Sequence, residues 1–378
     1  MKTKLLKYIK RMLIGIGILI GIIVIATTLF IKLSPEFGGK ATKEQKAIYA
    51  TSDNYKDEKF VNKNEVQLDM SFRDMGKSII GYFKPQPKTV PKENLSVKKI
   101  DSLNIVEHNG KTRLIWFGHS TFLLQMNAKN ILIDPMFGEV PAPHPLLGSK
   151  RFSKELPIEV EKLPEIDAVL ISHDHYDHLD YGTIKKLKSK VKMFYTPLGV
   201  GAHLQEWGIA KERIVELDWW QETTFEDLIF RCTPAQHFSG RGLTDRTKTL
   251  WSSWIIQSQT ENIFFSGDSG YASHFKEIGE KYGPFDFAMI ECGQYNEMWP
   301  DIHMFPEETA QAGLDVKAKT VMPIHWGAFK LAMHTWTDPV KRVTEKAKEL
   351  NIDIITPQIG TSILLEDLIT SSSSWWKS

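Results

Sequence analysis

Ala168-Val-Leu-Ile-Ser-His-Asp-His-Tyr-Asp-His-Leu-Asp180 places an apolar run directly before three histidines and three acids. The run predicts a buried strand, because strands covered on both faces read as continuous apolar segments. Side chains two positions apart on an extended backbone point the same way, so His173 and His175 can hold one metal ion together. Asp177 and His178 are adjacent and must diverge, which suits a second ion beside the first. The alternative is a polar turn with surface histidines, for which this spacing would be a rare coincidence.

Three more potential ligands follow later apolar runs. His237, Asp268 and His325 each come shortly after a segment that reads as a strand. If these strands end at one rim of a sheet, the three side chains join the first cluster and make seven ligands, which is what two metal ions need. Imidazole and carboxylate without a thiolate suit zinc, and also Mn2+ or Fe2+. Taken singly, a histidine at a strand end is more often structural.

Short apolar strands alternate with helices from Arg113 onward. The sequence predicts strands at residues 114–117, 121–124, 131–133, 168–171, 191–195, 214–217, 228–232, 253–257, 262–265, 287–291, 320–324 and 352–355. Helices are expected at 183–188, at 201–207, from Pro306 and at 339–350. This order indicates an α/β layered sandwich, with paired sheets inside and helices outside.

The N-terminus has the pattern of a membrane anchor. Residues 1–11 carry five cations and no acid, and residues 12–31 carry no charge. Such a run forms a helix of about 30 Å, the hydrocarbon thickness of a bilayer. The cations predict a single-pass protein with a cytoplasmic N-terminus and an extracytoplasmic main domain. A cleaved signal peptide is the alternative, although the run is long for one.

We divide the chain into a cationic flank (1–11), an anchor (12–31), a connector (32–109), a main domain (110–368) and a flexible tail (369–378). Prolines between residues 84 and 91 favour an extended connector. Part of the connector should pack on the main domain, because several of its apolar side chains are costly to leave in water: Phe72, Ile79, Ile80, Tyr82 and Phe83.

Composition excludes some classes of function. The formal net charge of the 378 residues is +1, which offers no electrostatic footprint for nucleic acid. Cys232 and Cys292 are too few for a disulfide framework and have no C-x-x-C spacing. Both lie in apolar segments, so buried free thiols are expected, with a single disulfide as the alternative.

The ligand pattern resembles the metallo-β-lactamase superfamily, and within it the N-acyl-phosphatidylethanolamine-hydrolysing phospholipases D and their bacterial relatives. The resemblance covers roughly residues 113–366. It rests on the ligand pattern and on these segments: Ile133-Asp-Pro-Met-Phe137, Lys150-Arg-Phe152, His175-Tyr-Asp-His-Leu-Asp-Tyr181, Glu216-Leu-Asp-Trp-Trp220, Gly267-Asp-Ser-Gly-Tyr271, Gly283-Pro-Phe-Asp286 and Ile324-His-Trp-Gly-Ala-Phe329.

The resemblance implies an αββα four-layer sandwich with two Zn2+ ions. One ion would be held by His173, His175 and His237, the other by Asp177, His178 and His325, with Asp268 as the bridging ligand. It further implies that Asp134 and His119 orient the imidazole ligands from behind. His303 would donate a proton or a hydrogen bond to a phosphate oxygen, so the catalytic residues would be Asp177, Asp268 and His303.

The implied activity is that of a membrane-anchored phosphodiesterase of phospholipase D type, which would cleave N-acyl-phosphatidylethanolamine-like lipids with metal-activated hydroxide. Aromatic residues near the motifs are expected to contact the acyl chain, or else to be ordinary core aromatics: Tyr176, Tyr295, Trp299 and Trp326. The chain departs from vertebrate members at Pro145-Leu146 and at Asp174, so head-group specificity stays open.

Two other functions remain open at this level. The first is hydrolysis of a soluble substrate such as a sugar-phosphate lactone. The second is a non-catalytic metal-binding domain at the cell envelope, which the complete ligand set disfavours. The expected partners are a membrane phospholipid and a second copy in a homodimer, with no nucleic acid.

Overall fold

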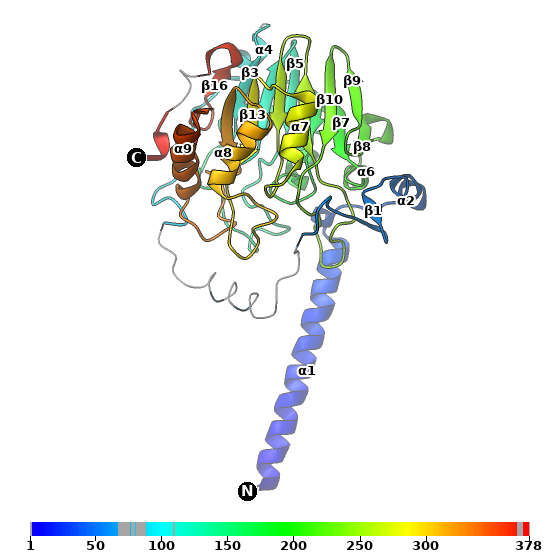
Figure 1. Cartoon of the computed structure of the whole chain (residues 1–378). Helices are drawn as coiled ribbons and strands as arrows, with labels where there is room; N and C mark the ends of the chain where they lie inside the picture. The colour runs from blue at the N-terminus through cyan, green and yellow to red at the C-terminus, as the bar shows by residue number, and fades with distance from the viewer. Residues whose placement is uncertain are drawn as a thin grey trace.

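Two β-sheets of seven strands each form the centre of the molecule, and helices cover their outer faces (Figure 1). A computed structural model describes residues 2–66, 76, 80, 88–108, 110–368 and 373–377. The arrangement is the expected αββα sandwich. A long N-terminal helix projects from one end of it.

The first sheet has the strand order β16-β3-β4-β5-β6-β7-β8. Its strands, in chain order, are β3 (Arg113–Trp116), β4 (Phe122–Met126), β5 (Lys129–Ile133), β6 (Ile166–Leu170), β7 (Val191–Pro197), β8 (Ile214–Leu217) and β16 (Ser362–Leu364). From β5 to β8 the strands are parallel, so their carboxyl ends share one rim of the sheet.

The second sheet has the strand order β15-β14-β13-β12-β11-β10-β9. Its strands are β9 (Glu222–Phe225), β10 (Leu228–Thr233), β11 (Ser253–Gln257), β12 (Asn262–Phe265), β13 (Phe287–Glu291), β14 (Thr320–Ile324) and β15 (Asp353–Ile354). From β12 to β15 these strands are also parallel. Each sheet therefore offers a row of parallel strand ends at which polar side chains can gather.

The helices lie outside the two sheets. On the second sheet these are α7 (His274–Tyr282), α8 (Pro306–Asp315) and α9 (Asp338–Leu350), and on the first sheet α4 (Ser102–Val106), α5 (Tyr181–Leu187) and α6 (Gly201–Glu206). Short 3-10 turns are η1 (Pro35–Phe37), η2 (Val160–Lys162), η3 (Lys211–Arg213), η4 (Leu365–Asp367) and η6 (Trp375–Lys377).

Alternation along the strands explains the layers. Ile131 and Ile133 of β5 belong to the core between the two sheets, whereas Leu132 between them packs in the outer core beneath the helices. Phe264 of β12 likewise faces the outer helices on the other side. Successive strand residues point to opposite faces, so a strand that is apolar throughout has to be covered on both faces.

The N-terminal helix α1 (Lys2–Leu33) packs against little of the protein. Its segment Lys4–Leu33 is long and apolar enough to cross a membrane, and none of the apolar window is buried. Large apolar side chains along it are exposed, for example Leu13 at 59% and Ile25 at 62%. Water would hydrate such a surface at high cost, which fits a membrane anchor or a signal segment.

The connector has regular structure before its proline segment, of which residues 84–87 lie outside the described residues. It forms α2 (Lys43–Tyr49) and a hairpin of β1 (Tyr55–Lys56) and β2 (Lys59–Phe60). Tyr49 and Phe60 are buried in the core between the sheets. Ile80 is exposed, and the other apolar residues predicted to pack here lie outside the described residues: Phe72, Ile79, Tyr82 and Phe83.

The end of the chain differs from the expected flexible tail. Trp376 is buried, and Trp375 stacks on Trp326 with ring centroids 5.5 Å apart. These two tryptophans close one side of the core, so burial of their large apolar surface holds residues 373–377 in place. Cys232 and Cys292 are buried free thiols, as expected.

Candidate metal centre

The polar residues predicted from the strand ends meet at one rim of the sandwich. His173 and His175 follow β6, Asp268 follows β12 and His325 follows β14 directly. His237 reaches the same place from the segment after β10. His173, His175, Asp268 and His325 come together because the parallel strands of both sheets end at this rim, and the segment after the antiparallel strand β10 brings His237 to them.

The first group of ligands contains His173, His175, His237 and Asp268, whose ligand atoms all lie within 4.8 Å of one another. His173 Nε2 lies 2.9 Å from His175 Nδ1, and His237 Nε2 lies 3.2 Å from the same atom. Three imidazole nitrogens and a carboxylate this close together form a ligand set suited to a divalent metal.

A second group, adjacent to the first, contains His119, Asp177, His178 and His325, also within 4.8 Å. His325 Nε2 lies 3.1 Å from Asp177 Oδ2. His119 Nε2 lies 2.8 Å from the same carboxylate oxygen. His119 thus contacts the carboxylate of Asp177, whereas the sequence predicted that it orients an imidazole.

Asp268 lies between the two groups. Its Oδ2 is 3.1 Å from His325 Nε2 and 3.8 Å from both His173 Nε2 and His237 Nε2. Its Oδ1 is 3.1 Å from His178 Nε2. A carboxylate that faces both groups is placed as a bridging ligand would be.

Two buried atoms in this centre test whether a metal fits. Among the described residues, His178 Nε2 and Asp268 Oδ1 have no hydrogen-bond partner of suitable geometry. A buried polar atom without a partner costs roughly 1–3 kcal/mol, so native proteins rarely keep one. Both are atom types that bind metal and lie 3.1 Å apart, and therefore the residues present fit a bound metal ion.

The ligands are oriented from behind by hydrogen bonds. Asp134 Oδ2 lies 2.7 Å from His178 Nδ1, and Asp134 also accepts hydrogen bonds from Ser172 N (2.7 Å) and Ser172 Oγ (2.5 Å). His237 Nδ1 donates to the carbonyl oxygen of Ile302 at 2.9 Å. In both histidines the bond made by Nδ1 leaves Nε2 with its lone pair toward the centre.

Three non-glycine residues of this centre have left-handed backbone conformations. They are His119 (φ 54°), Asp134 (φ 40°) and His325 (φ 66°), and each follows a strand. Such conformations are costly for residues with a Cβ and cluster at functional sites. A Cβ at Gly293 would lie 2.0 Å from the carbonyl oxygen of His325, so only glycine allows this approach.

Burial and charge set the protonation of four of the seven ligands: His173, His237, Asp177 and Asp268. Burial holds the pKa of His173 and His237 well below the usual range, which keeps them neutral. Burial acts to raise the pKa of Asp177 and Asp268, but nearby imidazoles, His178 first, outweigh it and hold both well below the usual range. Neutral imidazoles and ionised carboxylates are the forms that bind metal.

His303 and a buried glutamate form a pair beside the metal ligands. His303 Nδ1 contacts Glu291 Oε1, and Glu291 also accepts a hydrogen bond from the backbone N of Ser269. His303 belongs to a further close group with Asp268 and His325. The sequence analysis missed Glu291, although it ends an apolar strand, β13, as the predicted ligands do.

A cavity of about 300 Å³ opens onto the centre. Its lining combines ligands with apolar and cationic side chains: His175, Asp177, Phe238, Arg246, Asp268, Gln294, Trp299, Ile302, His303, His325 and Leu331. We call it the site cavity. The metal ligands and Arg246 give it a polar part, and Phe238, Trp299, Ile302 and Leu331 give it an apolar part.

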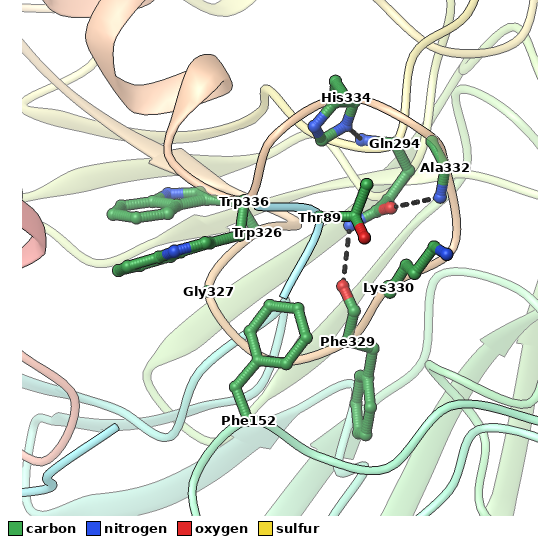
Figure 2. A pocket seen from close by; sticks show the side chains of 10 residues that line it. All are labelled: Thr89, Phe152, Gln294, Trp326, Gly327, Phe329, Lys330, Ala332, His334 and Trp336. Atoms are coloured by element: carbon green, nitrogen blue, oxygen red, sulfur yellow. Dashed lines mark hydrogen bonds between the residues drawn. The ribbon is translucent and has the colours of Figure 1, made fainter. Parts of the chain in front are cut away.

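Of the four residues predicted to contact substrate, Trp299 lines the site cavity. Tyr176 instead donates to the carbonyl oxygen of Arg241 at 2.6 Å, and Tyr295 stacks on His334. Figure 2 shows Trp326 beside a separate small pocket, where Gln294 bonds to the loop of residues 329–332. These three aromatics support the walls of the site and do not line its cavity.

Comparisons with known proteins show which proteins this chain is similar to. Residues 129–326 match the family described as beta-lactamase superfamily domain. An uncharacterized protein of Mycobacterium tuberculosis (strain ATCC 25618 / H37Rv) is 44% identical over 252 residues, which are 66% of this chain and 67% of that protein. The N-acyl-phosphatidylethanolamine-hydrolyzing phospholipase D 1 of Caenorhabditis elegans is 32% identical over 279 residues, 70% of this chain and 77% of that protein.

Solved structures share the fold. A possible metal-dependent hydrolase from Veillonella parvula superposes with a TM-score of 0.54 at 18% identity, covering 68% of this chain and 100% of that one. At this identity the likeness concerns the fold alone.

Proposed function

The chain belongs to the beta-lactamase superfamily and is a metal-dependent hydrolase, and from this premise we propose that it is a membrane-anchored phosphodiesterase of phospholipase D type. Its proposed substrates are phospholipids of the N-acyl-phosphatidylethanolamine class, and its proposed metal is zinc. The exposed apolar helix α1 is the proposed anchor, with the cationic residues before it on the cytoplasmic side and the sandwich on the other side.

The observation that carries the proposal is the composition of the site cavity. The metal ligands occupy one wall, Arg246 supplies a cation, and Phe238, Trp299 and Leu331 supply an apolar surface. A phospholipid is an anionic phosphodiester joined to long apolar chains, so its two halves match the two kinds of lining. A soluble sugar phosphate would leave the apolar part of the cavity without a complementary group.

His173, His175 and His237 would hold one ion, and Asp177, His178 and His325 the other, with Asp268 between them. Bound divalent cations supply positive charge that neutralises a phosphodiester and lowers the pKa of water. The protein itself orients the ligands. Asp134 and the carbonyl oxygen of Ile302 fix the tautomers of His178 and His237, so that Nε2 of each faces the centre.

His303 is the proposed proton donor. Its Nδ1 is held by the buried Glu291, which leaves Nε2 for a phosphate oxygen or the departing alcohol. Burial raises the pKa of Glu291, and the neighbouring His303 opposes this by favouring the charged carboxylate. The contact with Glu291 therefore orients the imidazole of His303 beside Asp268 and His325.

The test is product identification. Purified full-length protein is reconstituted with zinc and incubated with vesicles that contain N-acyl-phosphatidylethanolamine, and mass spectrometry follows the products. Phosphatidic acid and N-acylethanolamine are expected, because the bond cut lies on the head-group side of the phosphorus. A zinc-loaded protein that turns over a lactone or a soluble phosphodiester and leaves the lipid intact would contradict the proposal.

Two matched variants test the role of His303. His303→Gln should keep its metal content and lose about 10²-fold or more in kcat, which is the usual effect of removing a general acid. His108→Gln, a substitution at a half-buried histidine outside the site cavity, should leave kcat unchanged. Equal activity of the two variants would remove His303 from the mechanism.

A further inference from the structure

Exposed leucines lie in loops linked to the site cavity or to the segment after α1. Outside α1, Leu146 (86% exposed) and Leu243 (79%) have the highest exposed fractions of any large apolar side chain that the structure describes. Leu147 is 63% exposed, and Leu331, 40% exposed, also lines the site cavity. We call these four residues the leucine rim. Apolar side chains with such high exposed fractions are costly to leave in water.

The two loops that carry Leu146, Leu147 and Leu331 are connected to each other. Ser149 Oγ donates to the carbonyl oxygen of Lys330 at 2.8 Å and accepts from Lys330 N at 3.1 Å. These bonds tie the segment after Leu147 to the residue before Leu331. Gln294 Oε1 accepts a hydrogen bond from Leu331 N at 2.9 Å, which holds that loop at the edge of the site cavity.

The same loops hold the end of α1. Phe30 makes an edge contact with His144, with ring centroids 6.1 Å apart. Arg241, two residues before Leu243, donates from Nε to the carbonyl oxygen of Glu36 at 2.8 Å. Trp207 Nε1 donates to the carbonyl oxygen of Pro35 at 2.8 Å. These contacts attach the end of α1 and the turn after it to the sandwich.

The contact between Phe30 and His144 indicates how deep the leucine rim would lie in a membrane. Phe30 stands one residue before the end of the uncharged run, where a spanning helix leaves the hydrocarbon. His144 touches this level, and the backbone of Leu146 and Leu147 bonds back to His144. The turn that carries both leucines therefore lies at the height of the lipid–water interface.

We propose that the leucine rim docks into the surface of the bilayer that α1 enters. The proposal rests on the proposed role of α1 as a membrane anchor. Docking would place the mouth of the site cavity at the head-group level, so that a lipid reaches the metal ligands without leaving the bilayer for water. The opposite end of the sandwich, at α4, then faces away from the membrane (Figure 1).

The test measures membrane contact and needs no turnover. Leu146→Cys and Leu243→Cys are made in the full-length chain, labelled with the fluorophore NBD, and reconstituted into phosphatidylcholine vesicles that carry a nitroxide lipid. Cys232 and Cys292 are buried, so they should not react. The expected result is blue-shifted emission and strong quenching at both positions. Metal content equal to that of the unaltered chain verifies the fold of each variant.

Two other exposed apolar positions serve as controls. Leu103 (58% exposed) lies on α4, and Ile48 (57% exposed) lies on α2, near the end of α1 (Figure 1). Probes at Leu103→Cys and Ile48→Cys should emit as in water and escape quenching. If Leu146 and Leu243 give the water-like emission of Leu103, or if Ile48 is quenched as strongly as they are, the docking surface is refuted. Quenching without any lipid hydrolysis would leave the surface in place and remove the proposed substrate.

Discussion

Asp134→Asn should weaken metal binding although Asp134 is expected to touch no metal. The carboxylate accepts from His178 Nδ1 at 2.7 Å and from Ser172 N at 2.7 Å, and it is fully buried. An amide oxygen can still accept from Ser172, but the amide NH2 can only donate toward His178. His178 must then place its proton on Nε2, the atom that faces Asp268, and lose that lone pair as a ligand.

The expected loss is a 10–100-fold weaker metal affinity, about 1.4–2.7 kcal/mol. Asparagine adopts left-handed backbone conformations readily, so the φ of 40° at this position adds little strain to the variant. The measurement is competition for Zn2+ between the protein and a chromophoric chelator, with circular dichroism as a check of folding.

Asp167→Asn is the matched control. Asp167 lies on β6, accepts from Asn130 N at 2.8 Å, and pairs with Lys192. It belongs to none of the ligand groups. Its variant should bind Zn2+ as the unaltered chain does. Zinc affinity that is unchanged in Asp134→Asn, or lowered equally in both variants, would refute the tautomer argument.

Other variants test separate parts of the structure. Asp268→Ala should bind fewer than two metal ions per chain, which metal analysis will measure. Its hydrolysis of lipid and of a soluble phosphodiester should fall by at least about 10²-fold. Two tightly bound ions in this variant would contradict a bridging role. Burial lowers the pKa of His274 to about 3, so between pH 6.5 and 3 the unfolded chain binds a proton that the folded chain does not, and stability falls as pH falls. His274→Gln should therefore reduce the dependence of the unfolding free energy on pH by up to about 1.4 kcal/mol per pH unit in denaturant titrations, and an unchanged slope would count against it. Burial also raises the pKa of Cys232 and Cys292, so a thiol reagent should label them only after unfolding, and rapid labelling of the folded chain would contradict their burial.

The apolar pattern of the strands predicted much of the fold and of the metal centre. The run before His173 and the runs before Asp268 and His325 are β6, β12 and β14, and these ligands come together as expected. This worked because parallel strands buried on both faces read as continuous apolar segments, and because their carboxyl ends meet at one rim.

Other helices and strands are harder to recognise in the sequence. The edge strand β9 is half-exposed and reads as polar, and α7 contains the glycine Gly279 within its periodic pattern. The tail was predicted to be flexible because serines precede its tryptophans, yet Trp376 fills a gap in the core that only the tertiary structure creates. The same limit applies to Tyr176 and Tyr295, whose proximity to the motifs in sequence says nothing about which wall they support.

Glu291 could have been predicted as a site residue from its position at the end of a strand. It ends a buried apolar strand as the predicted ligands do, but it is an acid that pairs with His303 and not a member of the metal-ligand groups. Sequence spacing cannot separate these roles, because the difference lies in which side chain the neighbouring loop brings opposite the carboxylate.

The central claim is that two metal ions, held by the seven ligands, support lipid hydrolysis by the anchored protein. The most direct measurement is a zinc titration of chelator-treated full-length protein, with release of N-acylethanolamine from vesicles as the readout. We expect no hydrolysis by the metal-free protein and a rise in activity that levels off at two zinc ions per chain. Hydrolysis that survives complete metal removal, or full activity at one ion per chain, would contradict the account.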